Sequence, residues 1–324
     1  MSCFWPRYMS NNFIKSDPAR PNPGLGESAG SGGKELAQSG RFVFFACLIC
    51  LIYAIPLWRL FWYGWDDDAQ SHILLVPIIS GYLVATSGRQ WRSARRTRPM
   101  LAIVPALMGM LAVGGLFSAR LRGVAINEND SLSVMIFSFL CLLVAGGSWF
   151  LGSSAMKQLV FPAAFLGFMI PIPHAAMEGI NMFLQHASAE AANMMLSMAG
   201  PPFVREGLMF QLPGITLMVA EECSGVRSTL VLFITSILAS HLFLRSGWRR
   251  AILVAVVLPI AILRNGFRIY VIAMLCVHIS PSMINSAIHH RGGPIFFGLS
   301  LIPLFALMVW LRKRETIVKN ELCP

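Results

Sequence analysis

The stretch AEECSGVRS, residues 220–228, lies where a polar, turn-rich segment meets a long apolar run ending near Leu244. A thiol at such a boundary can ionise, whereas burial in apolar surroundings raises its pKa and keeps it protonated. Cys223 is therefore the cysteine that we expect to carry chemistry. The apolar run that follows it predicts a membrane helix, and the rest of the chain is interpreted from this junction.

Composition places the protein in a membrane. Of its 324 residues, 56% are hydrophobic, and the mean hydropathy is +0.64. Several apolar runs of roughly 18 to 25 residues are long enough to cross a hydrocarbon core of about 30 Å. The formal charge of +11 fits basic cytoplasmic loops better than a nucleic-acid partner. We therefore predict an all-α integral membrane protein.

The apolar runs predict about eight membrane helices with both ends of the chain in the cytoplasm. The basic loop from Arg89 to Arg98 should be cytoplasmic, and the acidic turn Asp66–Asp68 should face the other side. Arg120 and Arg122 are exceptions, because this topology puts them on the outer side. The expected spans are residues 42–63, 71–86, 100–118, 132–151, 158–172, 224–244, 251–276 and 294–311.

The predicted membrane domain of residues 42–311 is flanked by two tails and contains one insertion outside the membrane. Residues 1–41 are rich in Pro, Gly and Ser and are expected to form a disordered cytoplasmic tail. Residues 312–324 form a basic cytoplasmic tail. The insertion 174–222 should lie outside, with an amphipathic helix over 174–199 and then a β-hairpin whose strands, 203–211 and 215–220, precede Cys223.

The other cysteines give no sign of a disulfide framework or a metal site. Cys47, Cys50, Cys141 and Cys276 lie within apolar runs and are interpreted as small core residues. The spacing of Cys47 and Cys50 resembles a redox or metal motif, but no His or Cys partner lies nearby in the sequence. No metal and no cofactor is expected.

In the predicted topology Cys223 shares one membrane face with His289 and His290. Arg268 should lie about 12 Å below that face at 1.5 Å per residue, and Arg264 one turn deeper. An arginine at this depth costs at least about 2.5 to 3.5 kcal/mol, so it should face a partner or a functional site. A thiolate, an imidazole and a guanidinium together suffice for acyl transfer. The alternatives are ion pairs of the arginines with Glu221 or Glu222, and histidines that are only polar residues at a helix end.

The residues at these positions resemble the exosortase and archaeosortase family of membrane transpeptidases. The resemblance covers about residues 42–311. It includes ECSGVRS (222–228), NGFRI (265–269), HHRGG (289–293) with Phe296 and Phe297, and Ser71-His72 with Pro77.

The resemblance implies roles for some of the matched residues. It assigns the nucleophile to Cys223, the stabilising arginine to Arg268 and the proton carrier to His289, with His290 as a rival. Arg264, Glu222 and Arg227 are the expected substrate-binding residues. The family also implies a location in the bacterial inner membrane, with the active site on the periplasmic side.

The family acts on secreted proteins with a C-terminal sorting signal: a short motif, often Pro-Glu-Pro, then a membrane helix and a basic cluster. Cleavage through a thioester would pass the protein to an acceptor, for which a lipid or a polysaccharide are the candidates, or to water. Two other functions remain open from the residues. One is a transporter with Arg264 and Arg268 in an anion path. The other is a noncatalytic subunit of an export or polysaccharide assembly.

Overall fold

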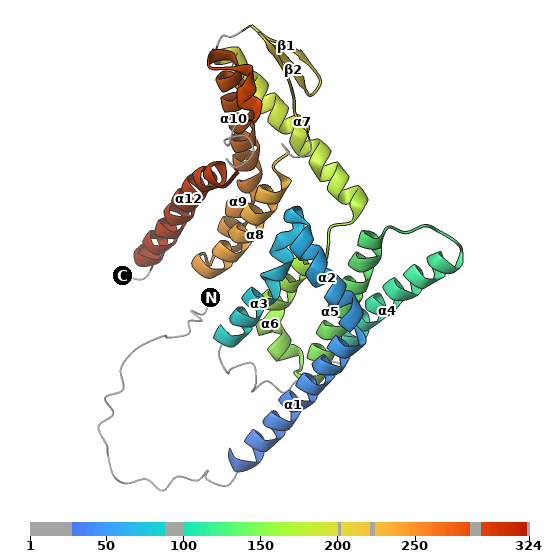
Figure 1. Ribbon diagram of the computed structural model, residues 1–324. Coiled ribbons are helices and arrows are strands. Elements are labelled where there is room, and N and C mark those ends of the chain that lie inside the picture. Colours follow the sequence, from blue (N-terminus) through green and yellow to red (C-terminus); the bar gives the residue numbers. More distant parts are fainter. Residues whose placement is uncertain (1–27, 88–99, 200–201, 221–223, 286–292, 323–324) are drawn as a thin grey trace.

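The computed structural model describes residues 28–87, 100–199, 202–220, 224–285 and 293–322, which are mainly helical (Figure 1). In the first half the elements are α1 (Ser28–Ile52), α2 (Ala54–Asp66), η1 (Asp68–Leu74), α3 (Val76–Thr86), α4 (Met100–Leu121), α5 (Glu128–Phe150), α6 (Ser153–Phe165) and η3 (Leu166–Met169). In the second half they are α7 (His174–Ala199), β1 (Val204–Glu206), β2 (Met209–Leu212), β3 (Ile215–Met218), α8 (Val226–Phe243), α9 (Gly247–Ala255), α10 (Val257–His278), η5 (Pro281–Asn285) and α12 (Gly293–Leu322).

The structure does not confirm all eight of the membrane spans that the sequence predicts. Within the described residues five helices are long and apolar enough to cross, or up to seven if each of two bent pairs is one span. The expected first span bends by 72° between α1 and α2. Pro56 explains this break, because its ring clashes with the carbonyl of residue 52, where α1 ends. The expected second span is a shorter apolar helix, Gln70–Thr86.

The expected fifth span also forms part of a bent pair. Residues 155–169 meet α7 at 88°. Pro171 and Pro173 lie in the connection between them. Proline lacks a backbone N–H and disfavours the helical conformation at the preceding residue, so a continuous helix is interrupted here. Because of this bend α7 runs across the end of the bundle, next to the sheet (Figure 1).

Two groups of helices each enclose a cluster of buried apolar residues. In the first, Leu60 of α2, Val76 of α3, Ile136 of α5 and Phe165 of α6 pack with Ile234 of α8. In the second, α8 packs with α9, α10 and α12. Helix α8 therefore contributes to both cores and links the two halves of the chain.

A three-stranded antiparallel sheet of order β1-β2-β3 covers one end of the α7–α10 pair. Phe210 is fully buried between the sheet and these helices. The expected hairpin had two strands, but the first of them is divided into β1 and β2 at Gly207, which has a positive φ of 61°. Pro213 and Gly214 connect β2 to β3, as the Pro-Gly signal predicts.

The helices at both ends of the described chain are longer than expected. Helix α1 begins at Ser28, so residues 28–41 are helical rather than disordered, while residues 1–27 lie outside the described part. The run KELAQ at 34–38 contains good helix formers and no proline, which explains the extension. At the other end α12 continues through Arg312 to Leu322.

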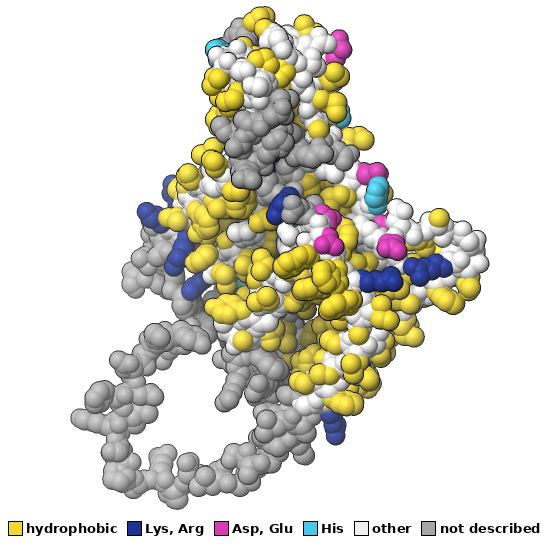
Figure 2. Space-filling view, in the orientation of Figure 1, with side chains coloured by type: hydrophobic (Ala, Val, Ile, Leu, Met, Phe, Trp, Pro, Cys, Tyr) yellow, Lys and Arg dark blue, Asp and Glu magenta, His cyan; other side chains and the backbone are white. Residues whose placement is uncertain are grey.

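Many large apolar side chains are exposed on the surface, as expected for helices in contact with lipid. Figure 2 shows hydrophobic side chains over the lower helices, with acidic side chains gathered between these helices and the upper part. Helix α4 leaves Met100, Met110 and Leu111 more than 60% exposed. Cys47 and Cys50 are exposed on α1 and Cys141 is half-buried, so of the four expected core cysteines only Cys276 is buried.

Candidate active site

A cleft of about 840 Å³ lies where elements from both halves of the chain meet. Helices α2, α5, α7, α8, α10 and α12 each contribute to its wall, and so does η1. Its polar and charged lining residues are Tyr63, Asp67, Gln70, Asn129, His174, Asn181, Ser224, Arg227, Ser228 and Arg268. This mixture of hydrogen-bonding groups in a concave site is typical of a binding or catalytic cleft.

The sequence Ser224-Gly225 forms the turn that leads into α8. Gly225 has a φ of +71°, a left-handed conformation that side-chain-bearing residues rarely adopt. A Cβ at this position would lie 3.0 Å from both Arg264 Nη2 and Asn265 Oδ1. The hydroxyl of Ser224 donates to Asn181 Oδ1 on α7 at 3.0 Å. The turn therefore needs glycine for its backbone angle and for its close contact with α10.

Helix α10 packs tightly against α7 beside this turn. Asn265, only 2% exposed, donates from Nδ2 to Ser188 Oγ at 3.0 Å. A Cβ on Gly266 would be 2.5 Å from Ala191 Cβ, so only glycine fits between the two helices. The motif at 265–269 thus fixes α7 beside the turn at 224–225.

The two arginines of α10 lie in different surroundings. Arg264 is 7% exposed, and its Nη2 donates to the carbonyl of Gly225 at 3.4 Å. Its Nη1 is buried and has no hydrogen-bond partner among the described residues. Arg268 is half-buried and lines the cleft. Arg264 therefore contacts the turn at Gly225, while Arg268 lies at the wall of the cleft.

Of the remaining predicted site residues, the structure describes only Arg227. Arg227 is exposed and lines the cleft. Cys223, Glu222, His289 and His290 lie outside the described residues. The prediction that the thiol meets an imidazole therefore stays a prediction.

The start of α12 also contributes to the cleft. Gly293, Pro294 and Phe297 line it. Phe296 is buried, and its ring meets that of Phe267 on α10 edge to face at 6.2 Å between centroids. Gly293, Phe296 and Phe297, which belong to the motif that begins at His289, are thereby held beside the helix that carries Arg268.

One wall of the cleft was missed by the sequence analysis. Gln70 is 1% exposed and donates from Nε2 to Tyr63 Oη at 2.6 Å, while its Oε1 accepts from the backbone N–H of Ile172 at 3.0 Å. The polar run after the expected first span was the only available signal for this wall. Its residues were interpreted as an ordinary outer turn.

His174, also missed, begins α7 and lines the cleft. Its backbone N–H donates to Asp130 Oδ1 at 2.8 Å, and its Nδ1 lies 3.5 Å from Glu178 Oε1. The cleft is therefore lined by a histidine that the sequence did not single out.

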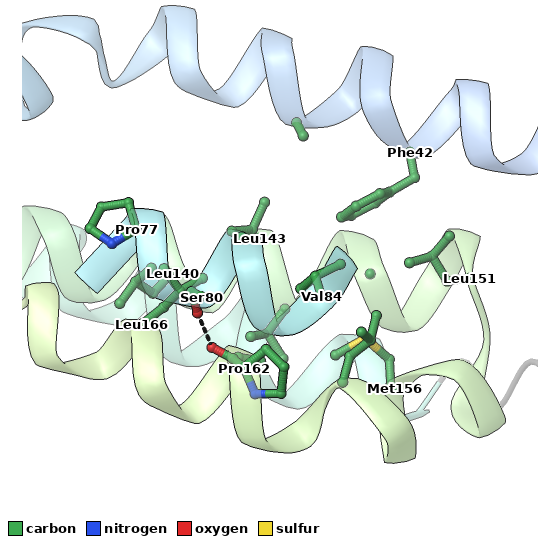
Figure 3. A pocket seen from close by; sticks show the side chains of 16 residues that line it. Phe42, Pro77, Ser80, Val84, Leu140, Leu143, Leu151, Met156, Pro162 and Leu166 are labelled. Carbon is green, nitrogen blue, oxygen red and sulfur yellow. Dashed lines mark hydrogen bonds between the residues drawn. The ribbon is translucent and has the colours of Figure 1, made fainter. Parts of the chain in front are cut away.

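A separate hollow of about 380 Å³ lies between α1, α3, α5 and α6 (Figure 3). Its lining is almost wholly apolar and includes Phe42, Leu143 and Met156. The Ser80 hydroxyl donates to the Pro162 carbonyl at 2.5 Å, so this polar group is already occupied. The lining residues include no acidic or basic side chain, and this hollow offers no group for acid–base or nucleophilic chemistry.

The model of the transmembrane exosortase family matches residues 62–306. The chain belongs to this family. The match covers more than half of the exosortase chain and includes every residue that lines the cleft, from Tyr63 to Phe297. Searches of curated proteins and of solved structures gave no match. Family membership suggests a membrane transpeptidase of sorting signals, which agrees with the resemblance seen in the sequence.

Proposed function

We propose that this exosortase is a cysteine transpeptidase that cleaves C-terminal sorting signals of secreted proteins. Cys223 is the nucleophile, Arg268 stabilises negative charge, and His289 moves protons, with His290 as the rival. Family membership supports the general activity. The assignment of individual residues is a proposal that combines the sequence motifs with the cleft.

The cleft itself is the observation that carries this proposal. Arg268 of α10 lines it together with Ser224, in the turn before α8, and Gly293, at the start of α12. Cys223 is the residue before Ser224, and His289 precedes Gly293 by four positions. A cleft that gathers the neighbours of both motifs around the arginine is what a shared catalytic site requires.

The proposed reaction follows from the chemistry of these groups. The Cys223 thiolate attacks the scissile carbonyl, and the guanidinium of Arg268 stabilises the resulting oxyanion. Collapse of this intermediate forms a thioester and releases the C-terminal fragment, whose new amine takes a proton from the histidine. An acceptor amine or hydroxyl then gives its proton to the histidine, attacks the thioester and regenerates the thiol. Water in place of the acceptor gives hydrolysis.

The substrate should enter the cleft from the membrane. We propose that its membrane helix lies against the bundle, its basic tail stays in the cytoplasm and its motif reaches the cleft on the periplasmic side of the inner membrane. Arg227, which is exposed in the cleft, is suited to contact an acidic residue of the motif. Lipid and polysaccharide remain the candidate acceptors.

The experiment is capture of the acyl-enzyme with a tagged secreted substrate. Cys223→Ala should accumulate full-length substrate and form no thioester, whereas Cys47→Ala, at an exposed cysteine of α1, should process normally. His289→Ala should retain slow processing, because a positioned acid or base typically contributes about 10² to 10⁴ in rate. His290→Ala and His174→Ala test the other histidines. Normal processing by Cys223→Ala would refute the cysteine mechanism.

A further inference from the structure

A second polar hollow, of about 900 Å³, adjoins the candidate active site. It lies between α2, the end of α4 and the start of α5, and α5 packs against both other helices (Figure 1). Tyr63 and Asn129 line this hollow as well as the cleft. The two spaces therefore share a wall, but the second contains none of the proposed catalytic residues.

Two arginines from different helices line this hollow. Arg59 lies on α2, within an otherwise apolar sequence, and Arg120 lies in the last turn of α4. Arg120 donates from Nη2 to Ser131 Oγ at 2.5 Å. Neither guanidinium forms an ion pair within the described part of the chain, although Glu128 lines the same hollow. Two positive charges thus face one negative charge. An arginine in a membrane segment is costly, and for this reason it usually indicates a functional site.

The same hollow opens toward the surface that faces lipid. Trp58 and Trp62 line it and are 64% and 46% exposed. Tryptophan is enriched at the level of lipid headgroups, because its ring is apolar and its N–H can meet polar groups. Ile55, which is 71% exposed, and Met135 add apolar lining beside these rings.

We propose that this hollow binds the headgroup of an anionic phospholipid from the leaflet on the side of the cleft. Arg59 and Arg120 would bind the phosphate, because a guanidinium donates two parallel hydrogen bonds to phosphate oxygens. The acyl chains would pass along the tryptophans into the membrane. This ligand also gives a reason for Arg120, whose position on the outer side opposes the usual charge bias. The proposal does not depend on the peptidase activity.

The test is lipid binding by the purified full chain in detergent, measured by native mass spectrometry. Phosphatidylglycerol should bind more tightly than phosphatidylcholine or diacylglycerol. Arg59→Gln and Arg120→Gln should each weaken phosphatidylglycerol binding about tenfold, as expected for the loss of a charge-assisted hydrogen bond. Arg122→Gln is the matched control, because Arg122 is exposed two residues further on and does not line the hollow.

Arg59→Lys keeps the charge and should lose less affinity than Arg59→Gln, which separates ligand binding from a folding defect. Equal binding of phosphatidylglycerol and phosphatidylcholine would overturn the proposal. So would an equal loss in Arg122→Gln. If glycerol phosphate competed with phosphatidylglycerol as well as another whole lipid does, the hollow would be a site for free phosphate. If only an acidic peptide displaced phosphatidylglycerol, the hollow would be a peptide site. Either result refutes a lipid site.

Discussion

Replacing Gly266 with alanine should destabilise the protein, although alanine is the better helix former. The new Cβ would lie 2.5 Å from Ala191 Cβ and 3.1 Å from the backbone nitrogen of Ala192. Carbon atoms in contact prefer about 3.5 to 4.0 Å, so α7 and α10 would have to separate by about 1 Å. That shift would also stretch the 3.0 Å hydrogen bond between Asn265 and Ser188.

The magnitude follows from opposing effects. Overpacking costs about 1 to 3 kcal/mol, and a buried hydrogen bond broken on one side costs about 1 to 3 kcal/mol more. The gain in helix propensity from glycine to alanine is about 1 kcal/mol. We therefore expect a net loss of about 1 to 5 kcal/mol for Gly266→Ala. Processing should also fall, because α7 and α10 both line the cleft.

Thermal unfolding of the purified chain in detergent gives the measurement. Gly115→Ala on α4 is the control, because a Cβ there meets nothing within 4 Å. The control should melt at or slightly above the temperature of the native protein, and Gly266→Ala clearly below it. If Gly266→Ala melted as high as the control, the close packing of α7 on α10 would be refuted.

Three further predictions concern the cleft and the topology. Arg268→Lys should abolish most processing, because lysine lacks the planar, forked guanidinium of arginine, whereas Arg264→Lys should lower the processing rate only mildly. If a processing assay gave the opposite order, the roles of the two arginines would be reversed. Ser188→Ala should lower the free energy of unfolding by about 1 to 3 kcal/mol, because it removes the hydroxyl that accepts a hydrogen bond from the buried amide of Asn265. An unchanged midpoint in a denaturant titration would contradict this prediction. A reporter enzyme fused after Arg96 should be active only in the cytoplasm, and activity in the periplasm would invert the topology.

Local chemistry in the sequence predicted several features of this protein. Long apolar runs must form helices in a membrane, because backbone groups have no other hydrogen-bond partners there. The positions of α4, α5 and α12 follow from such runs. The turn at Gly225 and the start of α8 at Val226 agree with the predicted boundary. Pro213-Gly214 likewise predicted the turn between β2 and β3.

The tertiary structure decided which side of each helix faces protein, because a helix that is apolar all round carries no periodic signal for its buried face. The sequence therefore suggested a core position for Cys47 and Cys50, which the structure shows to be exposed. Small residues, such as Gly266 against Ala191, determine where such helices approach each other. The contact needs partners that are far apart in the chain. No local pattern could therefore predict that α7 supports the turn before α8, or that Tyr63 and Gln70 form a wall of the cleft.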